Sequence, residues 1–170
     1  MDFLEKNLED IIYAAMQSKE GLQMLYQRGL SVFEYGINTK TIRQLNVGNY
    51  GTADIVTVER FSAEQNRRAY LNITVYELKK KTINLGVLLQ VYRYCKGIKQ
   101  YLSKRYFVEE VNFKICLIGS EIDTHTDWVY MFDFELPEIN VYKYNYQIDG
   151  IKFSLEELSN YALTNEGFKL

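Results

Sequence analysis

Residues 70–79 read YLNITVYELK, an apolar stretch that ends in charged residues, and this stretch decides the fold. The pattern predicts a β-strand, in which successive side chains point to opposite faces. Leu71, Ile73 and Val75 then share one face, and Glu77 and Lys79 continue it. Folding alone gains nothing from two charges there, because desolvating a charge is costly unless it is paired or binds a metal. The carboxyl end of this strand is therefore where we expect a metal-dependent active site.

The composition fits one domain of ordinary size. The chain has 170 residues, and 47% of them are apolar, which is enough for a core and argues against disorder. It contains a single proline, Pro137, and we find no Gly/Ser/Pro-rich linker, repeat or low-complexity tract. We expect one domain over 1–170, with a core over about 2–135 and a C-terminal hairpin and helix over about 139–165.

Charge and cysteine content indicate which binding partners and which cellular compartment to expect. The formal net charge is −2, so any nucleic-acid surface must be local. No apolar run approaches the ~20 residues of a membrane span, and the charged N-terminus does not resemble a signal peptide. Cys95 and Cys116 fall in expected core elements, which favours reduced thiols. We therefore expect a cytoplasmic protein without a membrane partner.

The spacing of apolar residues predicts an α/β fold. The expected helices cover 3–17, 20–28, 83–105 and 155–163, and the expected strands cover 41–48, 53–60, 70–79, 111–118 and 128–134, with a β-hairpin around Asp149-Gly150. The first three strands are separated by short polar turns, which favours an antiparallel meander. The strand–helix–strand order that follows implies a parallel crossover. Together these elements predict a mixed β-sheet flanked by helices.

Further polar residues accompany the end of the strand over 70–79. Asp54 opens the preceding strand, and Glu5 and Glu9 lie on one face of the first helix. Gln90 and Tyr94 lie one turn apart on the long helix, so they share a face.

This arrangement resembles the PD-(D/E)XK nuclease superfamily. Its restriction-endonuclease-like core has a helix, a three-stranded antiparallel meander, a second helix and a strand added in parallel. Asp54 matches the acid at the start of the second strand, and Glu77 and Lys79 match the D/E-x-K motif at the end of the third. Glu9 or Glu5 matches the acid that the first helix often carries.

A second motif supports the resemblance, and one residue departs from it. Residues 90–94 read QVYRY and match the QxxxY signature of RecB-like members. Ala53 stands where the motif has a proline, which is among its less constant positions. The resemblance covers about residues 2–118.

The resemblance implies a nuclease that hydrolyses DNA phosphodiester bonds with Mg²⁺, or with Mn²⁺ as a substitute. Asp54 and Glu77 would hold the metal through hard oxygen ligands, and Glu9 or Glu5 would add a third carboxylate. The metal would activate a water, which Lys79 would orient, or Lys79 would stabilise the transition state.

The residues around these ligands receive supporting roles. Gln90 and Tyr94 would orient the nucleic-acid backbone or the catalytic groups. The basic residues after the motif could contact phosphates, although a solvated helix face explains them nearly as well; they are Lys80, Lys81, Arg93, Lys96 and Lys99. The expected partner is DNA rather than RNA, and a homodimer stays open because one site cuts one strand.

Several alternatives remain from the sequence alone. The same fold could be an idle nucleic-acid-binding or protein-interaction module, or a purely structural subunit. Tyr142, Tyr144 and Tyr146 alternate along one strand face, where sheet packing is a better explanation than base stacking. His125 lies in an acidic loop whose spacing could be made into a metal site, but a polar loop is the simpler interpretation.

Overall fold

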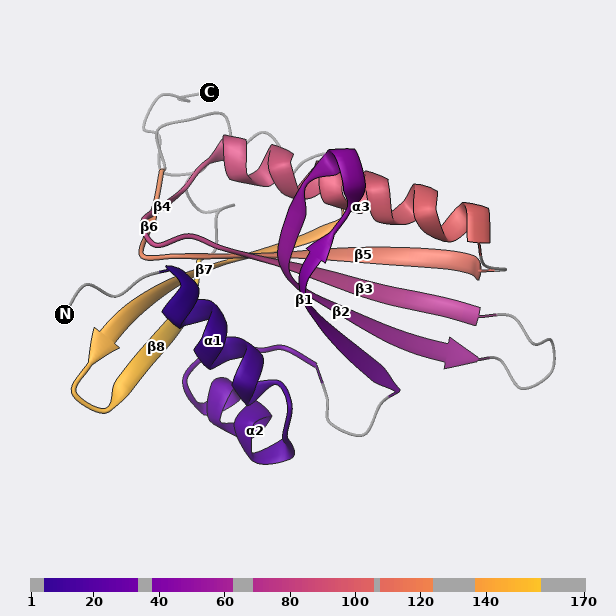
Figure 1. Cartoon of the computed structure of the whole chain (residues 1–170). Coiled ribbons are helices and arrows are strands. Elements are labelled where there is room, and N and C mark those ends of the chain that lie inside the picture. The colour runs from indigo at the N-terminus through magenta and orange to yellow at the C-terminus, as the bar shows by residue number, and fades with distance from the viewer. Residues whose placement is uncertain (1–4, 34–37, 63–68, 106–107, 124–136, 157–170) are drawn as a thin grey trace, which may run out of the picture.

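The computed structural model describes residues 5–33, 38–62, 69–105, 108–123 and 137–156. Its elements follow one another along the chain as shown in Figure 1. They are α1 (Glu5–Ala15), α2 (Lys19–Gln27), β1 (Thr39–Asn46), the 3₁₀ turn η1 (Gly48–Tyr50), β2 (Thr52–Ser62), β3 (Ala69–Leu78), β4 (Thr82–Ile83), α3 (Leu85–Arg105), β5 (Val108–Gly119), β6 (Glu121–Ile122), β7 (Glu138–Gln147) and β8 (Gly150–Leu155).

The described strands form a mixed sheet, as the sequence predicts. The six-stranded sheet has the order β1-β2-β3-β5-β7-β8. Strands β1, β2 and β3 pair antiparallel as a meander, and β5 adds to β3 in parallel after α3. Strand β7 continues the sheet in parallel with β5, and β8 closes it as an antiparallel hairpin partner of β7. The coarse fold class is therefore confirmed.

Two predicted boundaries change for physical reasons. The helix expected from residue 83 begins at Leu85, because Thr82 and Ile83 pair with β6 in a small parallel sheet. The Asn84 side chain then accepts a hydrogen bond from the backbone N–H of Val87, at 3.1 Å, which is the usual role of a residue before a helix. The helix expected from residue 155 is wrong at its start, since Leu155 is the last residue of β8 and pairs with Tyr142.

Two other predicted elements lie wholly or largely outside the described residues. These are the strand expected over 128–134 and the rest of the final helix, over 157–163. The second helix ends at Gln27 with Arg28 as its cap, and Gly29, which we expected to close it, follows with a φ of 92° that suits glycine. The N–H of Leu30 also returns to the carbonyl of Leu25 at 2.9 Å and satisfies a terminal acceptor of α2.

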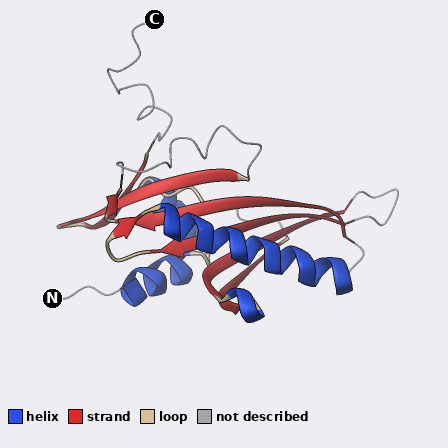
Figure 2. Cartoon of the chain, turned by 90° about the horizontal axis from the view of Figure 1, so that it is seen from above, coloured by secondary structure: helices blue, strands red, loops and turns tan. Residues whose placement is uncertain are grey.

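Helices cover both faces of the sheet. Helix α3 lies on one face, while α1 and α2 lie on the other (Figure 1). Seen from above, α3 runs along the strands (Figure 2). Its buried residues Val87, Leu88 and Val91 belong to one core cluster with the β3 residues Leu71, Ile73 and Val75. The face that the sequence assigned to the core of β3 is thus the face under α3.

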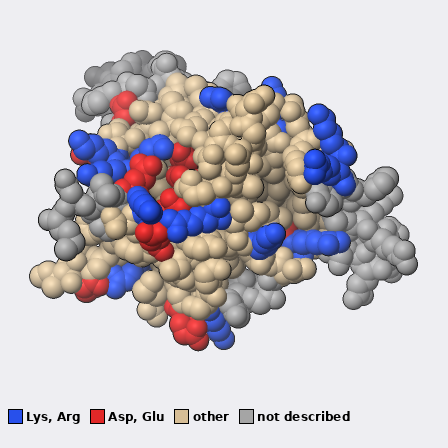
Figure 3. All heavy atoms as spheres, viewed as in Figure 1, with Lys and Arg blue, Asp and Glu red and all other residues tan. Residues whose placement is uncertain are grey.

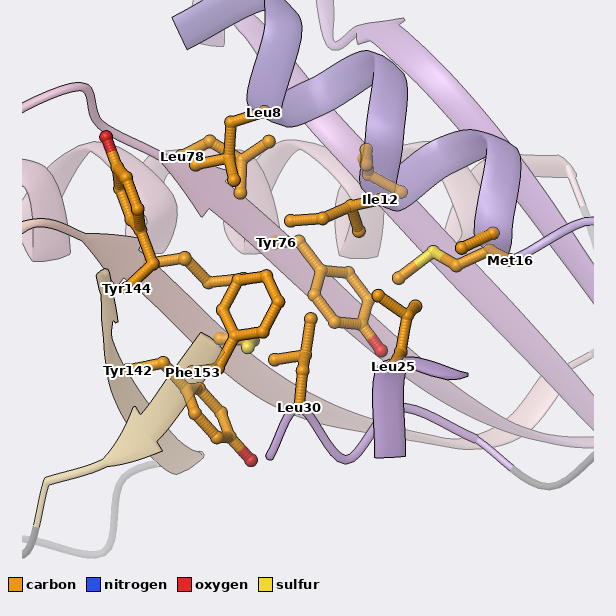
Figure 4. Close-up of a cluster of buried hydrophobic side chains, with 14 of the residues drawn as sticks. Leu8, Ile12, Met16, Leu25, Leu30, Tyr76, Leu78, Tyr142, Tyr144 and Phe153 are labelled. Carbon is orange, nitrogen blue, oxygen red and sulfur yellow. The ribbon is translucent and has the colours of Figure 1, made fainter. Parts of the chain in front are cut away.

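The second core lies between the sheet and the first two helices. Figure 4 shows Leu8 of α1 pointing toward Leu78 of β3 and Ile12 toward Tyr76, with Phe153 of β8 in the same cluster. Leu8 and Ile12 are fully buried, and burial of one such side chain contributes about 1.5–3 kcal/mol. This packing fixes α1 against the sheet and so fixes where its acidic residues lie.

This packing tests the predictions for the two cysteines and for the tyrosines of β7. Cys95 and Cys116 are buried free thiols, and they belong to the clusters on opposite faces of the sheet. Tyr142 and Tyr144 are buried in the cluster under α1 and α2, which confirms sheet packing for these two tyrosines. Within the described part of the chain, no helix combines the length and apolar character needed to cross a membrane.

Candidate active site

Asp54 and Glu77 lie close together where β2 begins and β3 ends. The antiparallel pairing of the two strands runs as far as Ile55 opposite Tyr76, and Asp54 and Glu77 are the next residue on each strand. The negative charge of Asp54 raises the pKa of Glu77, so the two carboxylates are near enough to repel each other. The backbone N–H of Leu78 also donates a 2.8 Å hydrogen bond to Oδ2 of Asp54. The two strands therefore bring the two predicted acids together.

Glu77 is a buried carboxylate that is only half satisfied. The residue is 1% exposed, and its Oε1 accepts a 2.7 Å hydrogen bond from the Lys79 ammonium. Its Oε2 is buried without a hydrogen-bond partner among the described residues. Burial, followed by the nearby charge of Asp54, raises the pKa of Glu77 to about 7 and outweighs the opposing effect of Lys79. The ammonium of Lys79 thus compensates the charge of ionised Glu77 only in part.

Lys79 continues the same face, as the sequence predicts. Its backbone N–H extends the hydrogen bonding with β5 by donating to the carbonyl of Ile118 at 2.8 Å. Burial alone would lower the pKa of Lys79, but its hydrogen bond to Glu77 and the attraction of nearby carboxylates raise that pKa above its usual value. Lys79 therefore stays an ammonium at neutral pH, held beside Glu77.

Asp54 is partly buried and held through both oxygens. Besides the bond from Leu78 to Oδ2, the Gln44 amide donates a 3.4 Å hydrogen bond to Oδ1. Burial raises the pKa of Asp54, and the charges of Glu5 and Glu9 add to this effect. Several negative groups thus converge here, and a cation at this point would relieve their repulsion.

The two acids of α1 reach this region differently. Glu9 is 6% exposed, and its two oxygens accept hydrogen bonds from Arg43 at 2.5 Å and from Gln44 at 2.9 Å. Glu5 accepts a 3.1 Å hydrogen bond from the backbone N–H of Lys80, directly after the D/E-x-K motif. Its charge raises the pKa of both Asp54 and Glu77. Both predicted acids are therefore near the site, and which of them binds a metal stays a prediction.

The described residues contain no ready-made cluster of three metal-binding side chains. No group of three or more His, Cys, Asp or Glu residues in this part of the chain is arranged to hold an ion. Within it, the candidate ligand set is the pair Asp54 and Glu77. The acidic loop around His125 is described only in part. Glu121 and Asp123 belong to the described residues, whereas His125 and Asp127 lie outside them.

Gln90 and Tyr94 approach the carboxylates from α3. The Gln90 amide donates a hydrogen bond to the hydroxyl of Tyr94, which is buried. Burial raises the pKa of Tyr94, and the charges of Glu77 and Asp54 raise it further. The charges of both acids therefore act on this hydroxyl, and the supporting role of Tyr94 stays a prediction.

An open pocket adjoins this side of the site. Its volume is about 400 Å³, and its lining comes from the turn before β2 and the first half of α3: Tyr50, Gly51, Gly86, Leu89, Gln90, Arg93 and Tyr94. Gly51 has a φ of 112°, and a Cβ there would lie 2.9 Å from Cε1 of Tyr94. Only glycine allows the chain to pass this close to Tyr94 and still enter β2 at Thr52, two residues before Asp54.

The predicted basic residues divide into two groups. Arg93, Lys96 and Lys99 are exposed on α3, and none of them forms an ion pair with another described residue. Lys80 and Lys81 follow β3, where the carbonyl of Lys80 accepts a 2.8 Å hydrogen bond from the Tyr144 hydroxyl. Figure 3 shows acidic and basic side chains side by side in one patch at its left, over the start of α1.

Sequence patterns did not indicate Arg43 and Gln44. Arg43 binds Glu9 and also Asp10, the latter at 2.5 Å, and Gln44 joins Glu9 to Asp54. Both lie in the middle of a strand that has no recognisable motif. Their role depends on how α1 packs against β1, which local spacing does not report.

Comparisons of this chain with protein-family models, with curated proteins and with solved structures find no match.

Proposed function

We propose that this chain is a metal-dependent nuclease that hydrolyses DNA phosphodiester bonds with Mg²⁺ or Mn²⁺. One observation carries the proposal: Glu77 is buried within reach of the charge of Asp54, with Oε1 on Lys79 and Oε2 without a partner among the described residues. An acid, a second acid and a lysine in this relation are what the PD-(D/E)XK resemblance implies. The fold supports it at a coarser level, with a mixed sheet covered by helices on both faces.

The donor atoms fit a small divalent cation. A buried oxygen without a partner typically costs about 1–3 kcal/mol, and a bound cation would remove that cost. Asp54 and Glu77 offer hard oxygens, and Mg²⁺ in proteins is commonly held by one or two carboxylates while it keeps several waters. The raised pKa values of both acids have the same origin, since burial leaves their charges without enough positive charge nearby. The residues present therefore suit Mg²⁺ or Mn²⁺.

Each residue then has a task in phosphodiester hydrolysis. Asp54 and Glu77 would hold the ion, which when bound supplies an activated water and neutralises charge on the phosphate. Lys79, kept protonated by Glu77, can orient the attacking water or stabilise the charge that develops on the phosphate. Tyr94, whose hydroxyl accepts a hydrogen bond from Gln90, would help to orient these groups or the nucleic-acid backbone from the side of α3.

Binding of the nucleic acid would use the exposed face of α3. Arg93 lines the pocket beside Tyr94, and Lys96 and Lys99 follow it along the helix. Cations without ion-pair partners are suited to phosphate contacts, which are the main source of sequence-independent affinity. This proposal names DNA as the partner, in line with the resemblance.

One observation favours the rival, an idle module with the same fold. Both oxygens of Glu9 are already bound by Arg43 and Gln44, and the described residues provide no third free acid in a cluster. An idle module would still bind nucleic acid or protein, but it would not need a cation at Asp54 and Glu77.

A cleavage assay separates the two functions. Linear, circular, branched and single-stranded DNA would be incubated with Mg²⁺ or Mn²⁺, using the parent, Lys79→Ala and Lys152→Ala. Lys152 is exposed on β8, outside the proposed site and DNA surface, and serves as the matched control. We expect cleavage by the parent and by Lys152→Ala, and loss of cleavage in Lys79→Ala. If the parent cuts none of these substrates with either metal, the nuclease proposal fails.

A further inference from the structure

Gln44 adopts a backbone conformation that glutamine rarely adopts. Its φ is 48°, and it is the one described residue other than glycine with a positive φ. It lies in β1 between the pairs Arg43–Ile55 and Leu45–Ala53, so its position in the ladder is opposite Asp54. Such a conformation is unfavourable for a residue with a Cβ and persists only where its surroundings enforce it.

The side chain of Gln44 shows what this conformation achieves. Its Nε2 donates a hydrogen bond to Oε2 of Glu9 at 2.9 Å and another to Oδ1 of Asp54 at 3.4 Å. Both partners are carboxylates, which only accept, so the NH₂ end of the amide must point toward them. One amide thus bridges an acid of the first helix and an acid of the second strand.

Glu9 forms the fixed end of this bridge. It is buried on α1, and Arg43 binds its other oxygen while also binding Asp10. Both Glu9 oxygens therefore have partners inside the protein. At the far end, the Leu78 N–H and the Gln44 amide hold one Asp54 oxygen each. The orientation of the Asp54 carboxylate is set from both sides.

We propose that Gln44 is a positioning residue for Asp54, and that Glu9 anchors Gln44 instead of binding metal itself. This inference rests on the proposed function, because it assigns the residues that orient one of the proposed metal ligands. A ligand held in one orientation loses less freedom on binding an ion, and partners of this kind typically change metal affinity by about 10–100-fold. The strained backbone at Gln44 then serves to orient Asp54 and does not serve to stabilise the fold.

Two substitutions separate positioning from a structural role. Glycine and asparagine both accept a positive φ better than glutamine, so Gln44→Gly and Gln44→Asn relieve the strain. Glycine removes the amide, and asparagine shortens its reach by one methylene. Relief of the strain offsets the loss of the hydrogen bond to the buried Glu9, so we expect only a small change in melting temperature. Mn²⁺ affinity measured by calorimetry should fall by about 10–100-fold. A residue with only a structural role would not change metal affinity without a matching loss of stability.

A second readout needs no metal. The Leu78 amide donates to Asp54, so its hydrogen exchange measured by NMR reports whether that carboxylate stays in place. We expect faster exchange at Leu78 in Gln44→Gly and Gln44→Asn. Gln147→Asn, at an exposed position on β7, is the control that leaves Leu78 unchanged.

The outcomes decide between the two proposals. Unchanged Leu78 exchange in both Gln44 variants overturns the positioning role, whatever the metal does. Faster exchange in a protein whose parent binds no Mn²⁺ keeps the positioning role and removes the proposed metal chemistry. Glu9→Gln tests the anchor: loss of Mn²⁺ affinity with unchanged Leu78 exchange would make Glu9 a ligand and overturn its role as an anchor.

Discussion

The backbone N–H of Leu78 donates a 2.8 Å hydrogen bond to the side chain of Asp54, and this bond joins the start of β2 to the end of β3. The proposed ligand Asp54 therefore also has a structural task, which the buried Oε2 of Glu77 does not share. The same two strands carry both acids, so a change at either acid affects stability and chemistry together. Separating the two effects needs paired substitutions.

Asp54→Asn and Asp54→Ala form the first such pair. Asparagine keeps an oxygen that can accept from Leu78, whereas alanine leaves the Leu78 N–H without that partner. We expect Asp54→Ala to be less stable than Asp54→Asn by about 1 kcal/mol in urea unfolding. Both variants should lose Mn²⁺ binding in calorimetry, because neither carries the carboxylate charge. Equal stability of the two variants would show that the Leu78 bond is not important for folding.

The raised pKa of Glu77 predicts how the stability of the metal-free protein depends on pH. The folded protein holds the Glu77 proton up to a pKa of about 7, whereas the ordinary value is 4.5. An acid with a raised folded-state pKa lowers stability as pH rises from the ordinary value to the folded value. Glu77→Gln removes this charge, so it should match the parent at pH 5 and exceed its stability at pH 8 by up to roughly 3 kcal/mol.

Urea unfolding in EDTA at the two pH values measures this difference. Adding Mn²⁺ at pH 8 should then stabilise the parent but not Glu77→Gln, since only the parent keeps the charged ligand. A stability difference that is the same at pH 5 and pH 8 would mean that Glu77 does not titrate in this range.

Gly51 gives a prediction about the turn that enters β2. Gly51→Ala brings a Cβ to 2.9 Å from the buried ring of Tyr94 at a φ of 112°, so both the backbone and the packing oppose it. Gly48→Ala is the matched control, because a Cβ there meets nothing within 4 Å. We expect Gly51→Ala to lose about 1–3 kcal/mol more than Gly48→Ala in urea unfolding. Nearly equal losses would show that Tyr94 moves aside without cost.

Strand β3 shows which features the sequence alone can predict. Alternation placed Leu71, Ile73 and Val75 on one face and Glu77 and Lys79 at its end, and the structure has α3 over that face and an ion pair at that end. The strand that carries Asp54 followed from the same local pattern, which predicted 53–60 where β2 covers Thr52–Ser62. These features were predictable because they depend on residues close together in the chain.

The conformation and contacts of Gln44 could not be predicted from the sequence. Its positive φ and its bridge to Glu9 exist because α1 packs beside β1, through contacts between residues more than thirty positions apart. The start of α3 was displaced for a related reason, since Thr82 and Ile83 pair with a strand almost forty residues later. Tertiary pairing overrides local propensity at such places, and no motif marks them.

The exposed cations of α3 give the last prediction. Arg93, Lys96 and Lys99 form no ion pair with other described residues, so their charges are available for phosphates. Neutralising all three to glutamine should weaken DNA binding and flatten its salt dependence, because fewer counterions are released. For duplex DNA the slope of log affinity against log salt should fall in magnitude by about 0.9 for each phosphate that the variant no longer neutralises. Mn²⁺ binding should stay unchanged, since it depends on Asp54 and Glu77.

A charge-matched control separates local contacts from net charge. Lys40, Arg60 and Lys152 are also exposed but come from three different strands, and their triple glutamine variant loses the same formal charge. If α3 holds the DNA, the control should keep a slope close to that of the parent, while the α3 variant does not. Equal slopes for the parent and the α3 variant would show that these three side chains contact no phosphate, and the binding surface would have to be sought away from this helix.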